Sequence, residues 1–328
     1  MIFCSQICRW LGLEFSQQEF GVKMASRKPY EIGQEAPFAI SRSKIENYVQ
    51  CPRCFVLDRR HNVSVPSGPS FTLNTAVDTL LKKEFDRHRE AGTVHPVLQQ
   101  LGCDLVPFKN ENMDVWRENF KGVRYLHEDT NLEVFGAVDD LWVNSDGELV
   151  VIDYKSTAKA SPVEELGTEK WHDAYRRQIE VYQWLLRQLG YRVSNTGYWL
   201  YETARNGADE FNQKLDFDAR LISHEGDTSW VEPTLYEIKR DLDDKELPWS
   251  GADCGVCKFF DDRAFATSKL GEEIYPHCFA CGEVKKKAIY GMPAGPLDED
   301  RYEMMGCVIG ESNPAWICPS CEKNFGVN

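Results

Sequence analysis

The order of apolar and polar residues changes its period several times along the chain. Apolar residues recur every three or four positions over 73–90 and 171–189, which predicts two long helices. Segments rich in β-branched and aromatic residues, bounded by turn residues, predict strands over 122–128, 132–143, 148–156, 195–203 and 215–223. Shorter helices are expected over 44–51, 113–120 and 230–242. This alternation indicates an α/β fold in which helices flank a mixed sheet.

Local signals describe the first two helices in more detail. Ser43 and Glu46 have the spacing of a capping box, so we expect a helix to begin near Lys44. The next helix, over 73–90, should bury one apolar face. That face consists of Leu73, Val77, Leu80, Leu81 and Phe85.

Length and charge narrow the class of protein. The chain has 328 residues, enough for about two domains of ~150 residues each. Its net charge of −14 argues against a basic protein that coats nucleic acid, although a local basic groove remains compatible with it. No apolar run approaches the ~18 residues of a membrane span, and Ser5, Gln6 and Arg9 interrupt the first apolar stretch. We therefore expect no secretory signal, no membrane segment and a cytoplasmic location.

The cysteines are distributed unevenly. Eight of the twelve lie in four CxxC pairs, a spacing typical of metal binding in a reducing compartment. After Pro248 the helical and strand periods fade and seven cysteines follow, as in a small module that metal ions stabilise. We predict a weakly ordered extension over 1–37, an α/β domain over 38–262 and a small cysteine-rich module over 263–328.

Charged residues stand at the end of an apolar strand. In the segment 148–156, Val151, Asp153 and Lys155 share one face because side chains alternate along a strand. If the preceding strand turns back around Asp146, Asp139 lies opposite Asp153. Two carboxylates at that separation repel each other unless a cation lies between them, and Mg²⁺ prefers such oxygen ligands. Lys155 would then stand beside the metal, where an ammonium can position water or stabilise developing negative charge.

A glutamine interrupts the apolar face of the helix over 171–189. Gln178 lies between apolar positions of that face, and Tyr182 follows one turn later. A glutamine on the core side needs hydrogen-bond partners, and residues four apart can point at the same place. The pair is therefore a candidate for a polar site beside the strand that carries Asp153.

Three short motifs in this order resemble those of a known family. They are GAVD at 136–139, IDYK at 152–155 and QIEVY at 178–182. They resemble the PD-(D/E)xK nuclease superfamily in its RecB-like branch, which includes CRISPR-associated RecB-like exonucleases and AddB-type helicase–nucleases. The resemblance covers roughly residues 38–260 and implies a restriction-endonuclease-like core.

The resemblance assigns roles to individual residues. It makes Asp139 and Asp153 ligands of Mg²⁺ or Mn²⁺, with the backbone carbonyl of Tyr154 as a further ligand, and it makes Lys155 the catalytic lysine. Gln178 and Tyr182 match the family's QxxxY motif. The family often places a histidine ligand on the first long helix, where this chain has Asp78, with Glu84 as a weaker candidate.

Two CxxC pairs lie near the two ends of the predicted α/β domain and could close it. Cys51 and Cys54 stand near its start, before the core, and Cys254 and Cys257 near its end, after the core. Four thiolates suit either a 4Fe–4S cluster or Zn²⁺. Relatives in the RecB-like branch hold an iron–sulfur cluster with one cysteine before the core and three after it, and this chain departs from that pattern.

A second quartet lies near the C-terminus. Cys278 and Cys281 are followed by Cys318 and Cys321 in an arrangement that resembles zinc-ribbon tails. Zn²⁺ is the ligand expected for four thiolates at this spacing. Such a module would have a structural role or would contact nucleic acid or a protein partner.

These observations predict a metal-dependent nuclease that hydrolyses phosphodiester bonds. The resemblance implies DNA rather than RNA as substrate and a role such as DNA repair. A rival hypothesis is an inactive nuclease fold that binds nucleic acid or a protein and keeps only structural metal sites. A third hypothesis is a redox sensor that uses the first cysteine quartet.

Overall fold

The structure is a computed structural model, and its described residues form two units. The first unit ends at Gly251 and the second begins at Ala252. Residues 1–27 of the predicted N-terminal extension lie outside the described part of the chain. The described residues are 28–65, 68, 71–270, 284–291, 295, 297–306, 314, 316–320 and 324–325.

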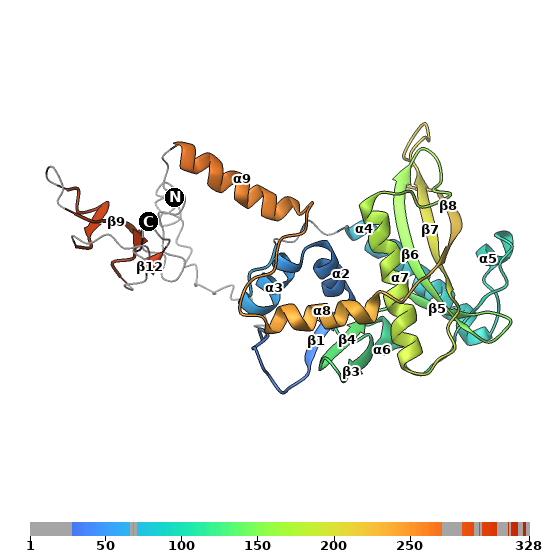
Figure 1. Ribbon diagram of the computed structural model, residues 1–328. Helices are drawn as coiled ribbons and strands as arrows, with labels where there is room; N and C mark the ends of the chain where they lie inside the picture. The colour runs from blue at the N-terminus through green and yellow to red at the C-terminus, as the bar shows by residue number, and fades with distance from the viewer. Residues whose placement is uncertain are drawn as a thin grey trace, which may run out of the picture. The chain divides into compact units, whose positions relative to one another are not determined.

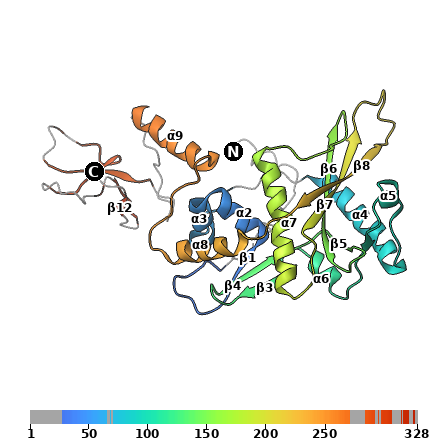
Figure 2. The ribbon, with the colours of Figure 1, turned by 45° about the vertical axis from the view of Figure 1, so that its right-hand side comes forward.

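A five-stranded mixed sheet forms the centre of the first unit (Figures 1 and 2). Its strand order is β2-β5-β6-β7-β8, in which β6 and β7 are parallel and the other neighbours are antiparallel. A parallel pair needs a crossover connection, and helix α7 (Lys170–Gln188) makes it. The strands are β2 (Val106–Pro107), β5 (Asp140–Val143), β6 (Leu149–Lys159), β7 (Thr196–Arg205) and β8 (Phe217–Glu225).

The first unit also contains a three-stranded sheet. Its order is β1-β4-β3, with β1 parallel and β3 antiparallel to β4. The strands are β1 (Phe38–Ser41), β3 (Val123–His127) and β4 (Leu132–Gly136). The single strand predicted over 132–143 is therefore wrong, because the chain leaves the small sheet at Gly136 and enters the large one at Asp140.

Helices cover both faces of the large sheet. Val151 of β6 packs in the core that contains Ile179 of α7, whereas Ile152 packs in a second core with Phe85 of α4 (Thr72–Ala91). Alternating side chains of β6 thus point to opposite faces, which confirms that Val151 and Asp153 share the α7 face. The second face is also covered by α5 (Pro96–Gln100), whose Leu98 is fully buried.

Helix α2 packs against α7, and α3 and α8 pack against α2. Tyr48 of α2 donates a hydrogen bond to Asp241 of α8 at 2.7 Å, and Glu46 of α2 accepts two bonds from Arg177 of α7 at 2.8 Å each. Figures 1 and 2 show α2, α3 and α8 together. The remaining helices of this unit are α2 (Arg42–Gln50), α3 (Pro52–His61), α6 (Met113–Arg117) and α8 (Val231–Asp243).

Two details of the predicted helices are wrong. Helix α2 begins at Arg42, and the residue before it, Ser41, makes no side-chain cap. Glu46 cannot act as a capping partner because Arg177 and Gln50 bind its carboxylate. On α4, Leu73 and Leu80 of the predicted apolar face are 59% and 63% exposed. The buried face of this helix is therefore narrower than the spacing of its apolar residues suggests.

The described residues of the second unit form one helix and a small sheet. Helix α9 (Gly255–Leu270) begins within the CGVC motif, directly after Cys254, so the expectation of little helical structure after Pro248 is wrong. The sheet has the order β10-β9-β11-β12. Its strands are β9 (Lys286–Ile289), β10 (Tyr302–Met304), β11 (Trp316–Ile317) and β12 (Asn324–Phe325).

None of the helices in the described residues has both the length and the apolar character needed to cross a bilayer.

Candidate active site

Asp139 lies in the short link between the two sheets of the first unit. The pairing of β5 with β6 aligns Asp140 with Ile152, which continues to Asp139 opposite Asp153. The register predicted from a turn around Asp146 is therefore confirmed. The backbone N–H of Tyr154 donates to Asp139 Oδ2 at 3.1 Å, so the link is held against β6.

Asp153, on β6, is a fully buried acidic residue. Lys155 Nζ donates to its Oδ2. The other oxygen, Oδ1, is also buried and has no hydrogen-bond partner among the described residues. The Lys155 ammonium lies 4.6 Å from the ring centroid of Tyr175 on α7. A buried carboxylate oxygen without a partner is costly, and a cation would satisfy it.

The two carboxylates have opposite protonation tendencies. Burial, together with the negative charge of Asp139, raises the pKa of Asp153 to about 6, although Lys155 opposes the shift. Burial would also raise the pKa of Asp139, but the charges of Lys82 and Lys155 hold it below its ordinary value. In the metal-free protein, a proton near neutral pH therefore goes to Asp153 first.

Helix α4 adds an acid and a second lysine. Lys82 Nζ lies 3.0 Å from Asp139 Oδ1 and 2.9 Å from the carboxylate of Asp78, one turn earlier. Burial and the charge of Asp139 raise the pKa of Asp78. The structure thus places Asp78 beside Asp139, with an ammonium between them. Glu84 points elsewhere and contacts His95 at 3.2 Å.

Asp140, the next residue, faces a different environment. Its carboxylate is fully buried and lies 2.5 Å from Arg89 Nη2 and 2.8 Å from Arg117 Nη2. The hydroxyl of Tyr154 donates to its Oδ2 at 2.6 Å. All of its charge is therefore neutralised within the protein, and Asp140 has a structural role.

Helix α7 places its glutamine and tyrosine beside the link that carries Asp139. Tyr182 Oη donates to the carbonyl of Ala137 at 2.6 Å, and Gln178 Nε2 donates to Tyr182 Oη at 3.5 Å. This approach needs glycine at position 136, because a Cβ there would lie 2.6 Å from Tyr182 Cε1. Tyr182 therefore positions the link, and Gln178 keeps donor and acceptor atoms available.

Two hollows meet at Asp139. A groove of about 1040 Å³ has Asp139, Gln178 and Tyr182 in its wall. A second hollow of about 440 Å³ is lined by Asp78, Lys82, Asp139 and Lys155, among others. Asp139 is therefore reachable from both hollows, whereas the buried Asp153 lies behind it and lines neither.

This donor set fits a hard divalent cation. Asp139 and Asp153 offer carboxylate oxygens, one of them buried without a partner, and Asp78 lies on the neighbouring helix. Mg²⁺ and Mn²⁺ prefer oxygen ligands of this kind. A bound cation would also remove the repulsion that raises the pKa of Asp153.

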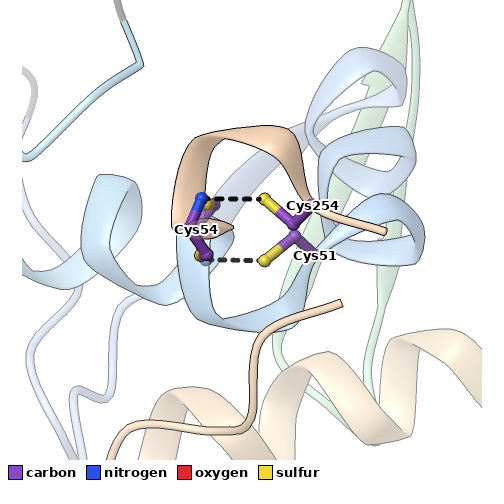
Figure 3. A group of neighbouring side chains, drawn as sticks. Cys51, Cys54 and Cys254 are labelled. Atoms are coloured by element: carbon purple, nitrogen blue, oxygen red, sulfur yellow. Dashed lines mark hydrogen bonds between the residues drawn. The ribbon is translucent and has the colours of Figure 1, made fainter. Parts of the chain in front are cut away.

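The first cysteine quartet comes together. The Sγ atoms of Cys51, Cys54, Cys254 and Cys257 all lie within 4.8 Å of one another (Figure 3). The backbone N–H groups of Cys54 and Cys257 donate to the sulfur atoms of Cys51 and Cys254, each at 3.5 Å. Such bonds orient thiolates toward a shared ion, so the group can bind a metal.

The second quartet is largely outside the described residues. Cys278, Cys281 and Cys321 are not described, and only Cys318, which is buried, can be placed, just after strand β11. Its assignment as a zinc site stays a prediction.

Comparison with known proteins identifies the family. The PD-(D/E)XK nuclease superfamily matches residues 39–261. The chain belongs to this superfamily, whose members are typically nucleases that use divalent metals. The mixed α/β architecture of the first unit is consistent with the superfamily's restriction-endonuclease-like fold.

Other comparisons add little. A search of the curated proteins found no match. Among solved structures, one titled "Crystal structure of SSO0001" is similar, with 15% sequence identity and a TM-score of 0.28. The match covers 66% of this chain and 82% of that chain.

Two residues of the site were not anticipated from the sequence. Lys82 is 57 positions away from Asp139, and Arg117, whose Nε donates to the Asp139 carbonyl at 3.0 Å, lies on a five-residue helix. A weak signal existed for Lys82, because it stands one turn after Asp78. No local pattern distinguishes Arg117 from an exposed arginine.

Proposed function

We propose that the protein is a metal-dependent nuclease of the RecB-like branch that hydrolyses phosphodiester bonds in DNA. The observation that carries this proposal is the buried Oδ1 of Asp153, which has no hydrogen-bond partner in the described part of the chain, while Asp139 lies opposite Asp153 and Lys155 beside it. A structural carboxylate such as Asp140 has its charge matched, whereas this one has a free oxygen.

Each residue of the site can be given a separate role in the reaction. Asp139 and Asp153 would hold the cation, which when bound would polarise the phosphate and make water more acidic. Asp78 and the carbonyl of Tyr154 are proposed as further ligands. Lys155 would position the attacking water and stabilise the charge that develops on the phosphate oxygens. Gln178 would contact the substrate backbone, and Tyr182 would keep the Asp139 link in place.

The first cysteine quartet is proposed to hold a structural metal. Zn–S bonds of ~2.3 Å put the sulfur atoms of one tetrahedral ion about 3.8 Å apart, whereas a 4Fe–4S cluster spreads its cysteines over four iron atoms. Sulfur atoms within 4.8 Å of one another therefore support a single Zn²⁺ more than a cluster. The second quartet is proposed as a zinc ribbon that contacts nucleic acid or a protein partner.

The test compares wild type with Asp153→Asn on labelled single- and double-stranded DNA. Cleavage by wild type with Mg²⁺ or Mn²⁺ but not with EDTA is expected, and Asp153→Asn should lose at least about 100-fold in rate. Asp146→Asn, in the exposed turn after β5, is the matched control and should cleave normally. Binding without cleavage in every condition would support the inactive binding module instead.

Metal analysis separates the two cysteine hypotheses. Anaerobically purified protein with zinc and no absorption band near 400 nm would support the zinc assignment. Iron together with inorganic sulfide would overturn the zinc assignment and keep the redox-sensor hypothesis open.

A further inference from the structure

The groove beside the proposed active site carries an exposed aromatic ring and an arginine that the proposed chemistry does not use. Phe120 and Arg42 line this groove of about 1040 Å³ together with Asp139. We propose that Phe120 stacks on an unpaired base and that Arg42 binds a backbone phosphate of the strand entering the site. This inference rests on the proposed nuclease function and names the residues that would select its substrate.

Both the exposure and the backbone conformation of Phe120 are energetically unfavourable. Its side chain is 77% exposed, and its φ of 70° lies in the left-handed region, which a bulky residue rarely adopts. An exposed phenylalanine loses the stabilisation that burial would give, and a left-handed backbone conformation is strained for a residue with a bulky side chain. A residue held so unfavourably indicates a use for the ring.

The turn that carries Phe120 is fixed by contacts of its backbone. Gly122, at φ 65°, approaches β4 so closely that a Cβ would lie 2.4 Å from the carbonyl oxygen of Gly136. The guanidinium of Arg124 donates to the Phe120 carbonyl and lies 4.4 Å from the ring centroid of Phe135. The Phe120 ring is therefore presented from a rigid base, which lowers the entropic cost of binding.

Arg42 is a cation of this groove that has no acidic partner among the described residues. Its Nε is buried without a hydrogen-bond partner, and it makes no ion pair among the described residues. Glu46, one turn later, is already bound by Arg177 and Gln50. By contrast, Lys44 in the same groove lies 2.6 Å from Asp58.

The position of Arg42 connects it with the catalytic residues. Its Cβ would lie 3.2 Å from a Cβ at position 136, on the same side as the ring of Tyr182. The buried Nε of Arg42, which lacks a partner, favours an anion, and the planar donors of a guanidinium match a phosphate. A phosphate here would lie along the groove that ends at Asp139.

Together the two groups favour a single strand. Every base has a π-face, so stacking tolerates sequence, but a base inside a duplex is already stacked on its neighbours. A duplex would have to unpair a base to reach Phe120. The expected substrate is therefore a single-stranded segment or a frayed end, selected by structure more than by sequence.

The test measures binding of a labelled single-stranded oligodeoxynucleotide by fluorescence anisotropy in EDTA, so that no cleavage occurs. Phe120→Ala should raise Kd by about 5- to 150-fold, and Phe120→Trp should restore it. The effect of Phe120→Ala should shrink on an oligonucleotide of abasic sites. Arg42→Gln should raise Kd and reduce the slope of log Kd against log salt by about 0.7. Phe211→Ala, at a ring that is 67% exposed and outside the groove, should bind as wild type.

The outcomes separate this inference from the proposed function. Wild-type affinity in both Phe120→Ala and Arg42→Gln would overturn the inference while cleavage by wild type still supported the nuclease. Equal losses by Phe120→Ala on single strands and blunt duplexes would overturn the stacking role. Failure of the wild-type protein to bind or cut any nucleic acid would overturn both.

Discussion

Asp140 offers a direct test of how two adjacent aspartates divide their roles. Its buried carboxylate lies between Arg89 and Arg117, whose side chains are only 5% and 9% exposed. Asp140→Ala would leave two buried guanidinium groups without this carboxylate. Breaking one side of a buried ion pair costs about 3–5 kcal/mol. Asp86 still contacts both arginines, at 3.1 and 2.6 Å, so we expect the lower end, about 3 kcal/mol.

Urea denaturation followed by circular dichroism in EDTA measures this loss. With a slope near 3 kcal/mol per M for a domain of this size, the midpoint should fall by about 1 M. Asp146→Ala removes an exposed carboxylate from the turn after β5 and should leave the midpoint unchanged. A midpoint of Asp140→Ala within about 0.3 M of wild type would show that the arginines find other partners and that the assignment of Asp140 is wrong.

Three further outcomes follow from the site. The pKa of Asp153 is raised from 3.8 to about 6, so the folded protein keeps this proton at a pH where the unfolded chain has lost it. The stability of the metal-free protein should therefore fall as the pH rises through about 6. Mn²⁺ affinity, measured by electron paramagnetic resonance, should rise over the same interval, because the cation no longer competes with the proton. A pH-independent affinity would contradict this. Lys82→Met removes an ammonium that competes with the cation for Asp139, so Mn²⁺ should bind about tenfold tighter or more. Weaker binding would instead show that Lys82 stabilises the metal-binding arrangement. Gly136→Ala puts a Cβ 2.6 Å from Tyr182 and should cost about 1–3 kcal/mol in a thermal melt, so an unchanged melting temperature would mean that the tyrosine moves freely.

Local pattern accounts for much of the fold. Strand β6 and helix α7 lie within a few residues of their predicted bounds, because a strand of period two and a helix of period 3.6 are encoded by neighbours in sequence. The register of β5 with β6 also followed from sequence, since a short turn leaves the hairpin little freedom. By contrast, the break after Gly136 was not predicted, although a glycine inside a strand pattern is a local sign of a bend.

The sequence by itself determined the elements, the family motifs and the expectation that Asp139 and Asp153 lie opposite each other. Only the tertiary structure decided that Asp140 is neutralised by two arginines whereas the Oδ1 of Asp153 is left without a partner. It also decided that Lys82 reaches Asp139 and that Phe120 stands exposed beside the same groove. The physical reason is that local structure depends on residues a few positions apart, whereas the charge balance around a buried group depends on helices and turns that are distant in the chain and meet only after folding.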